Sequence, residues 1–270
     1  MAFIHAGGLT VHVDVSGPHD APAIVFANSL GTNLHIWDAQ AAALGDRYRI
    51  VRYDMRGHGM TSFAPAGEDY AIAQLADDLA ALLDALRIER ASVVGLSIGG
   101  MVGQRFAAAY PERVDALVLC ATASRIGTPD VWDARIESIT TRGMSAIVEG
   151  VLDRWFTPAT HADRPDLVRG FSMMLKRTPV AGYAGCCMGI RDADLRADDA
   201  RITAPTLVIS GAADVVTPPS AGAEIRDAIP GAQFEVIDDA AHMLCAERPE
   251  ALDRLLGGFI GATASAGGMR

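Results

Sequence analysis

The sequence predicts an α/β fold, in which a mostly parallel, twisted sheet of about eight strands is flanked by helices and carries an inserted helical cap. Short apolar, β-branched runs alternate along the chain with segments of helical periodicity. Between residues 124 and 200 this alternation stops, and only helical patterns remain. The chain has 270 residues, half of them hydrophobic, which is enough for one large domain with such an insertion.

In the first half of the chain, predicted strands alternate with predicted helices, after two opening strands. Opening strands lie within residues 3–15, and the alternation at residues 10–15 predicts an edge-side strand with one face in water. The continuous apolar run at residues 23–27 predicts a strand deep in the sheet. Further predicted elements are a helix over 33–44, a strand over 49–54, a helix over 70–86 and strands over 91–94 and 114–121.

The second half contains the insertion and then returns to the first pattern. Residues 124–200 are expected to form a cap over the active edge of the sheet, because a structureless loop of this length is unusual. Strands over 205–211 and 233–237 follow, and then a helix over 251–260. We therefore predict a core domain of residues 1–123 and 201–262, the cap, and a flexible tail of residues 263–270 rich in Gly, Ala and Ser.

Composition and charge exclude several classes of partner. A net charge of −10 and a pI near 5.1 argue against binding to nucleic acid or to anionic membrane surfaces. No apolar run is long enough to cross a bilayer, and the first residues lack the pattern of a signal peptide, so we expect a cytoplasmic protein. Oligomeric state stays open. The four cysteines have no zinc-binding spacing and are expected to be buried free thiols: Cys120, Cys186, Cys187 and Cys245.

The stretch around Ser97 carries the strongest chemical signal. Gly95-Leu96-Ser97-Ile98-Gly99 is a G-x-S-x-G pattern between a predicted strand and a predicted helix, which is typical of a nucleophile elbow. A serine at so sharp a turn needs small residues two positions away on each side. The positive end of the following helix would lie where negative charge develops.

A serine hydroxyl near neutral pH needs a base, and His242 fits this role best. It follows the last predicted strand and lies downstream of Ser97. His58 ends a strand on the active edge, but its place before the serine and its flanking glycines favour a structural histidine bonded to backbone. His35 could touch substrate, and the remaining histidines are interpreted as surface residues or lack an obvious partner: His5, His12, His19 and His161.

Asp214 is the predicted acid. It follows the strand at 205–211, from where a carboxylate can reach the far nitrogen of an imidazole in the next loop. The loop of residues 28–32 follows the strand at 23–27 and is made of small and turn-forming residues. Such a loop beside the elbow could supply the second main-chain N–H of an oxyanion hole.

These features make the chain resemble the α/β-hydrolases, in which the triad occurs in the order serine, acid, histidine. Among them it is similar to the family of 3-oxoadipate enol-lactonases over nearly its whole length. The elbow and the turn at His58 are common to the superfamily, whereas the cap segments are particular to the family. The resemblance is carried by residues 28–32, 37–38, 52–59, 95–104, 125–127, 131–132, 154–157, 182–187 and 190–192.

The resemblance implies hydrolysis of a small anionic enol-lactone to a 3-oxo dicarboxylate, with neither cofactor nor metal. It implies that the N–H groups of Leu30 and Ile98 bind the oxyanion. Because the protein is acidic, a local cation must bind the substrate carboxylate. Candidates are the cap residues Arg135, Arg154 and Arg125, each of which could instead make a surface ion pair. Trp132 and Trp155 could form the pocket wall or pack within the cap.

Three other functions stay open at this stage. A general carboxylesterase or lactonase would use the same three residues on another acyl group. A carbon–carbon bond hydrolase of ring-cleavage products is a further enzyme alternative. A non-catalytic ligand receptor could keep the fold without the chemistry.

Overall fold

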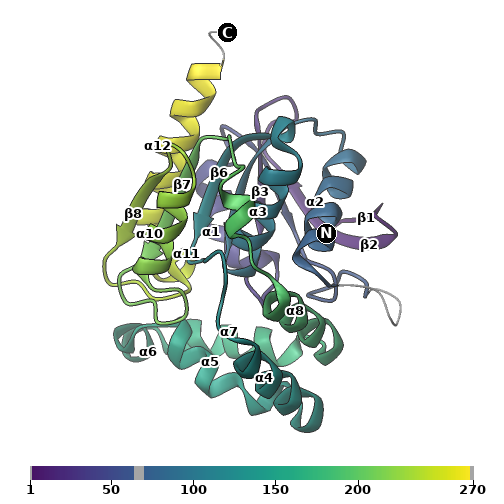
Figure 1. Ribbon diagram of the computed structural model, residues 1–270, viewed down its shortest axis with the longest axis vertical. Helices are drawn as coiled ribbons and strands as arrows, with labels where there is room; N and C mark the ends of the chain where they lie inside the picture. Colours follow the sequence, from purple (N-terminus) through teal and green to yellow (C-terminus); the bar gives the residue numbers. More distant parts are fainter. Residues whose placement is uncertain (1, 64–69, 268–270) are drawn as a thin grey trace.

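Eight strands form one sheet in the computed structural model, which describes residues 2–63 and 70–267. They lie in the order β1-β2-β4-β3-β5-β6-β7-β8 (Figure 1). β1 with β2 and β2 with β4 are antiparallel, and the other pairs are parallel, which confirms the predicted sheet. The strands are β1 (Ala2–Ala6), β2 (Leu9–Ser16), β3 (Ala23–Ala27), β4 (Arg49–Tyr53), β5 (Ala91–Leu96), β6 (Val114–Cys120), β7 (Thr206–Gly211) and β8 (Gln233–Ile237).

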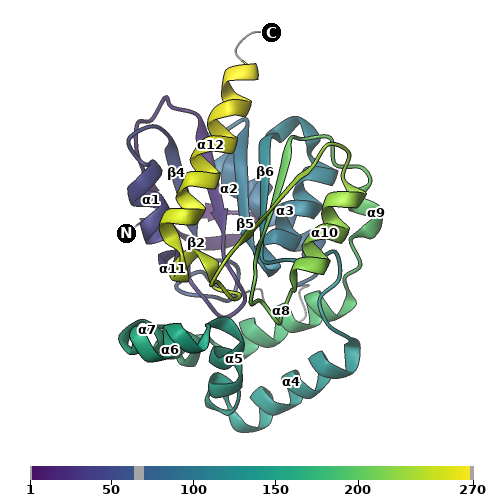
Figure 2. The same ribbon diagram turned by 90° about the vertical axis from the view of Figure 1, so that its left-hand side faces the viewer.

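Helices cover both faces of this sheet. Every residue of β3 and β5 is buried, as their apolar runs require. α1 packs on α12 at one face, while α2, α3 and α10 lie at the other (Figure 2). These helices and their short neighbours are η1 (Leu34–Trp37), α1 (Asp38–Leu44), α2 (Ile72–Ala85), α3 (Ile98–Ala109), η2 (Pro111–Arg113), α9 (Arg196–Asp199), α10 (Pro219–Ala228), α11 (Leu244–Glu247) and α12 (Pro249–Gly267).

The chain between β6 and β7 is helical, as expected for the cap. Its longer helices form a layer below the carboxyl ends of the parallel strands (Figures 1 and 2). Within this layer α4 packs on α8, and α5 packs on α7. The cap contains α4 (Pro129–Arg142), η3 (Met144–Ala146), α5 (Val148–Trp155), α6 (Pro158–Asp163), α7 (Pro165–Arg177) and α8 (Val180–Asp192).

The two chain segments that connect cap and core are bonded to each other. The main-chain N–H of Leu195 donates to the carbonyl of Ser124 at 2.8 Å. The Ser124 hydroxyl donates to the carboxylate of Asp199, which is fully buried. The entry and exit of the cap therefore form one hinge with a buried carboxyl group in it.

One prediction about the ends of the chain was wrong. β2 lies next to the edge strand β1, but its polar face is not in water at His12, which is buried against Asp54, 2.8 Å from Nδ1 to Oδ2. Residues 263–267 of the expected tail belong to helix α12, and the flexibility of this tail stays a prediction. Residues 268–270 lie outside the described part of the chain.

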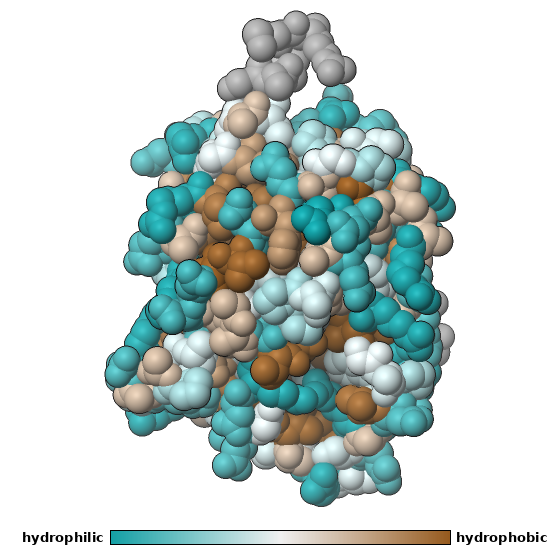
Figure 3. Space-filling model, turned by 60° about the vertical axis from the view of Figure 1, so that its left-hand side comes forward, coloured by the Kyte–Doolittle hydropathy of each residue, from teal (hydrophilic) through white to brown (hydrophobic). Residues whose placement is uncertain are grey.

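Hydrophobic and hydrophilic side chains are mixed on the surface (Figure 3). On the face shown in Figure 3, hydrophobic patches are interrupted by hydrophilic side chains. Within the described residues, no helix combines the length and apolar character needed to span a membrane. All four cysteines are buried free thiols, as predicted.

Candidate active site

Ser97 lies at the tip of a sharp turn between β5 and α3. Its backbone has φ 60° and ψ −118°, a conformation that L-residues adopt only under constraint. A Cβ on Gly95 would lie 2.1 Å from the carbonyl oxygen of Gly99, and one on Gly99 would lie 2.2 Å from that of Ala27. The small residues at both positions are therefore required by close backbone approach, as the pattern predicted.

Hydrogen bonds from the next strand hold this turn in place. The N–H of Ser97 donates to the carbonyl of Cys120 at 3.0 Å. The Thr122 hydroxyl donates to the carbonyl of Ser97 at 2.7 Å, and both residues are buried. The strained turn is thus fixed from two sides, which keeps the direction of the Ser97 side chain defined.

His242 and Asp214 form a buried pair. Nδ1 of His242 lies 2.9 Å from Oδ2 of Asp214. The same carboxylate accepts from the Thr217 hydroxyl at 2.8 Å and from the N–H groups of Val216 and Thr217 at 2.8 and 3.1 Å. With Nδ1 donating to the carboxylate, Nε2 of His242 is available to accept a proton.

The pKa of the Asp214 carboxyl is held below its ordinary value. Burial by itself would raise this pKa. The positive charge of a protonated His242, the hydrogen bond with it and the hydrogen bonds from Thr217 together exceed the effect of burial. Asp214 is therefore ionised and can stabilise an imidazolium.

The three predicted residues follow the carboxyl ends of parallel strands. Ser97 follows β5, Asp214 follows β7 and His242 follows β8, and β5 to β8 are successive neighbours in the sheet. Carboxyl ends of parallel strands meet at one edge, so all three belong to the same edge. Ser97 is 6% exposed and His242 is 1% exposed, so the site is enclosed.

The predicted oxyanion donors also lie at this edge. Ile98 is the first residue of α3, where an N–H has no acceptor within the helix. No hydrogen bond within the described chain engages the N–H of Leu30. Gly31 has φ +77°, and a Cβ there would meet Leu175 at 2.5 Å and the Tyr183 ring at 2.9 Å. Cap residues therefore press directly on the loop that carries Leu30.

Two of the predicted cap cations lie together. Burial raises the pKa of Tyr183 on α8, and the charges of Arg135 on α4 and Arg154 on α5 oppose this effect, so both arginines lie near the phenol. Burial first, and then the charge of Arg135, lower the pKa of Arg154. Within residues 2–63 and 70–267, no carboxylate forms an ion pair with either arginine. We propose that these two partly buried guanidinium groups form an anion-binding cluster with Tyr183.

Of the other cap candidates, Trp132 contacts the cluster. Trp132 donates from its indole to the Ile126 carbonyl at 2.6 Å and stacks with Arg135, whose guanidinium is 5.0 Å from the ring centre. Trp155 packs edge-on against Phe171 inside the cap. Arg125 is exposed on the segment that enters the cap, so the structure does not bring it to the anion-binding cluster.

The rival histidines have other surroundings. His58 is buried, and its Nδ1 lies 3.2 Å from the carbonyl of Arg56, the structural role that its flanking glycines favoured. Burial lowers the pKa of its imidazole and keeps it neutral. His35 is exposed and pairs with Asp38.

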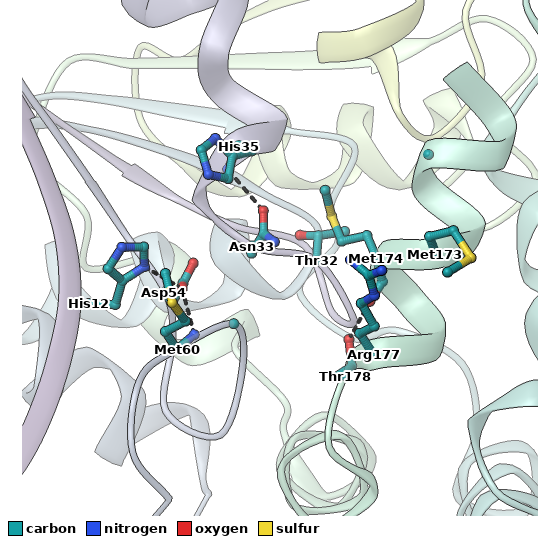
Figure 4. A pocket seen from close by; sticks show the side chains of 12 residues that line it. His12, Thr32, Asn33, His35, Asp54, Met60, Met173, Met174, Arg177 and Thr178 are labelled. Carbon is teal, nitrogen blue, oxygen red and sulfur yellow. Dashed lines mark hydrogen bonds and ion pairs between the residues drawn. The ribbon is translucent and has the colours of Figure 1, made fainter. Parts of the chain in front are cut away.

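A cavity of about 530 Å³ opens between the core and cap helix α7 (Figure 4). It includes His35 and the buried pair of His12 and Asp54 on the core side, and methionines and Arg177 on the cap side. Neither Ser97 nor His242 belongs to its lining. This cavity is therefore separate from the predicted catalytic residues. Among the described residues, no group of three or more His, Cys, Asp or Glu is placed to hold a metal ion.

Sequence reasoning missed three residues of this site. Thr217 lies three positions after Asp214, a spacing typical of a side-chain turn, and that signal was available. Tyr183 belongs to a segment that carried the family resemblance, but no pattern pointed to its place beside Arg135 and Arg154. Glu247, which accepts from the residue before His242, had no signal at all, because its cap partners Thr157 and Thr160 are 90 and 87 positions away.

The family and its relatives agree with this geometry. A family model described as alpha/beta hydrolase fold matches residues 22–249. The chain is 40% identical over 237 residues to 3-oxoadipate enol-lactonase 2 of Acinetobacter baylyi, covering 88% of each chain. It is 38% identical to 3-oxoadipate enol-lactonase 1 of the same organism, covering 94% of each.

A solved structure gives the same result at the level of the fold. The enol-lactonase from Burkholderia xenovorans LB400 superposes with a TM-score of 0.93 at 39% identity. The match covers 96% of this chain and all of that one. The similarity thus extends through the cap as well as the core.

Proposed function

The chain belongs to the α/β-hydrolase family, and on that premise we propose that it is a serine hydrolase that opens the lactone ring of 3-oxoadipate enol-lactone to give 3-oxoadipate. The observation that carries the chemistry is the buried pair of Asp214 and His242 at the sheet edge where the Ser97 elbow also lies. The substrate follows from the relatives, which match this chain through the cap. The reaction belongs to the breakdown of aromatic compounds, and the four free thiols support a cytoplasmic location.

In the proposed first half-reaction, Ser97 forms an acyl-enzyme. Its hydroxyl oxygen attacks the lactone carbonyl carbon while Nε2 of His242 takes the proton. Asp214 stabilises the imidazolium through the 2.9 Å bond to Nδ1. The ring C–O bond breaks, His242 protonates the enolate, and the enol relaxes to the ketone.

Water completes the reaction. His242 takes a proton from a water molecule, which attacks the acyl carbon. The acyl C–O bond to Ser97 then breaks, His242 returns the proton to the serine oxygen, and the second carboxyl group leaves and ionises. In both half-reactions the N–H groups of Leu30 and Ile98 would bind the oxyanion. Removing one such donor typically raises the barrier by about 3 kcal/mol.

The anion-binding cluster of Arg135, Arg154 and Tyr183 is the proposed site for the carboxylate of the substrate. Two guanidinium groups without carboxylate partners in the described chain offer paired donors of fixed geometry. Stacking on Trp132, whose ring centre is 5.0 Å from the guanidinium of Arg135, holds one of them in place. Because Tyr183 also lies on Gly31, the cluster is close to the proposed oxyanion donor Leu30.

A comparison of substrates tests this function against a general esterase. We expect kcat/KM for 3-oxoadipate enol-lactone to exceed that for p-nitrophenyl acetate by at least about a hundredfold, because only the lactone carries a carboxylate for the cluster. Equal efficiency on both would remove the assigned substrate and leave a general carboxylesterase. Cleavage of a ring-opened vinylogous diketone instead would favour the carbon–carbon bond hydrolase.

A further inference from the structure

Glu247 joins the cap to the loop that carries His242. Its carboxylate is 2% exposed at the end of α11. Oε1 accepts from the Thr157 N–H at 2.8 Å, the Thr157 hydroxyl at 3.0 Å and the Thr160 hydroxyl at 2.6 Å. Oε2 accepts from the N–H of Ala241 at 2.6 Å. One side chain thus bonds two cap residues and the residue just before His242.

The residue just after His242 is also bonded to the cap. The N–H of Met243 donates to the carbonyl of Trp155 at 3.0 Å. Trp155 is the last residue of α5 and directly follows Arg154. The main chain is therefore fastened on both sides of His242, on one side through Glu247 and on the other by a cap carbonyl.

The charge of Glu247 has no cationic partner in the described chain. No ion pair of residues 2–63 and 70–267 includes its carboxylate, so the four hydrogen bonds alone compensate for its burial. Burying a carboxylate is costly, and an apolar side chain can pack such a space at lower cost. Only a carboxylate supplies two acceptor oxygen atoms here. One accepts hydrogen bonds from the cap and the other accepts a hydrogen bond from Ala241.

We propose that Glu247 is a positioning residue for the general base, setting the main chain of His242 relative to the cap. The inference rests on the proposed serine-hydrolase function. The general base and the cap helix that carries Arg154 then belong to one rigid framework. If α5 and α6 moved away from the core, the bonds that position His242 would break. We therefore expect substrate to enter without such a movement.

Glu247→Gln tests the proposal because it is isosteric. An amide has one oxygen, so it can serve the threonines or the Ala241 N–H but not both. We expect kcat for the lactone to fall by about tenfold to a hundredfold, the usual effect of a misplaced catalytic group, while KM stays within about threefold. Rates are expressed per active site, and the active sites are counted by labelling the protein to completion with a serine-reactive phosphonate. Loss of folded protein then does not lower the measured kcat.

Two further variants separate positioning from stability. Thr160→Val removes one donor to Oε1 but leaves the Ala241 bond, so we expect a lower Tm with kcat near that of the unaltered protein. Glu247→Asp keeps the charge but is one methylene shorter, and it replaces the amide variant if that fails to fold, with an expected intermediate kcat. A lower Tm with unchanged kcat in both Glu247 variants would show a purely structural role and overturn the proposal, as would a raised KM with unchanged kcat.

Ser97→Ala separates this inference from the function on which it rests. If Ser97→Ala keeps its activity, the serine mechanism fails and the role of Glu247 fails with it. If Ser97→Ala is inactive but the Glu247 variants have normal kcat, only the positioning role is rejected.

Discussion

Arg135 and Arg154 repel each other, yet the fold holds both partly buried in the cap. The charge of Arg135 is among the causes that lower the pKa of Arg154. Such a pair is unfavourable without an anion, and within the described chain no carboxylate forms an ion pair with either residue. A bound carboxylate would relieve this repulsion, which is why we assign the pair to substrate.

Arg154→Met should weaken lactone binding without destabilising the free protein. The loss of one charge-assisted contact, worth about 1.5–3 kcal/mol, is expected to raise KM by about tenfold to a hundredfold. The Tm should stay the same or rise, because the repulsion with Arg135 disappears. Steady-state kinetics and thermal unfolding measure both effects. Arg142→Met, an exposed arginine in the same cap, should leave KM unchanged.

Ser97→Ala should abolish turnover and keep binding. Without the nucleophile we expect kcat to fall by about four orders of magnitude or more. Binding of the product 3-oxoadipate should keep its Kd within about threefold, as measured by calorimetry, because the anion-binding cluster is intact. Loss of both activity and binding would mean that the substitution disturbed the site as a whole.

At the scale of the elements, the start of α3 is the most crowded part of the fold. Gly95 and Gly99 approach backbone carbonyls so closely that neither can carry a side chain. A third glycine, Gly100, faces Thr122, where a Cβ would lie 2.6 Å from the threonine Cβ. This contact lets α3 begin directly behind Ser97, so the helix N-terminus points at the nucleophile.

Gly99→Ala and Gly258→Ala should have opposite effects on stability. At Gly99 a Cβ would lie 2.2 Å from the Ala27 carbonyl oxygen, so we expect a loss of at least about 2 kcal/mol and a fall in kcat. Gly258 is an exposed residue of α12, and no atom lies within 4 Å of a Cβ added there. Alanine there should stabilise by about 0.5–1 kcal/mol with normal activity. Urea unfolding of both variants checks the pair.

At the scale of the whole molecule, the cap is bonded to the core at several places. Asp199 and Ser124 join its two ends at the hinge, Glu247 bonds its middle to the His242 loop, and the Thr178 hydroxyl donates to the carbonyl of Gly31 at 3.1 Å. The oxyanion loop and the general base thus both receive contacts from the cap. The cap is therefore part of the catalytic framework in our proposal.

Asp199→Asn should stabilise the protein at high pH. Burial, together with the charges of Asp198 and Asp194, raises the pKa of Asp199 from 3.8 to about 6, against the hydrogen bond from Ser124 that lowers it. The folded state thus favours the protonated form, so the stability from this group is full below about pH 4 and is lost as the pH rises through about 6.

At pH 8 the Asp199→Asn variant should gain up to about 3 kcal/mol in the free energy of unfolding, and at pH 4 the gain should vanish. Chemical unfolding at the two pH values measures this. Asp20→Asn, at a side chain that is 99% exposed, should change stability little at either pH. An equal gain for Asp199→Asn at both pH values would exclude a titration of this carboxyl group.

The sequence alone determined the order of the elements, because local apolar periodicity reports which face of each element is buried. It also singled out Ser97 through the glycines around it, and Asp214 and His242 through their places after strands. The structure brings the side chains of Asp214 and His242 to within 2.9 Å of each other, and their catalytic roles stay predictions. Of the cap residues, periodicity could only predict helices, and Arg125 was indistinguishable from Arg135 and Arg154.

Only the tertiary structure decided which distant side chains meet. His12 was interpreted as a surface residue, but Asp54, the residue just after β4, packs against it in the interior. Glu247 and Thr157 are 90 positions apart, and Tyr183 reaches Arg135 from another helix. These contacts depend on how the helices pack on one another, and packing is set by the shapes of many side chains together, which no local pattern contains.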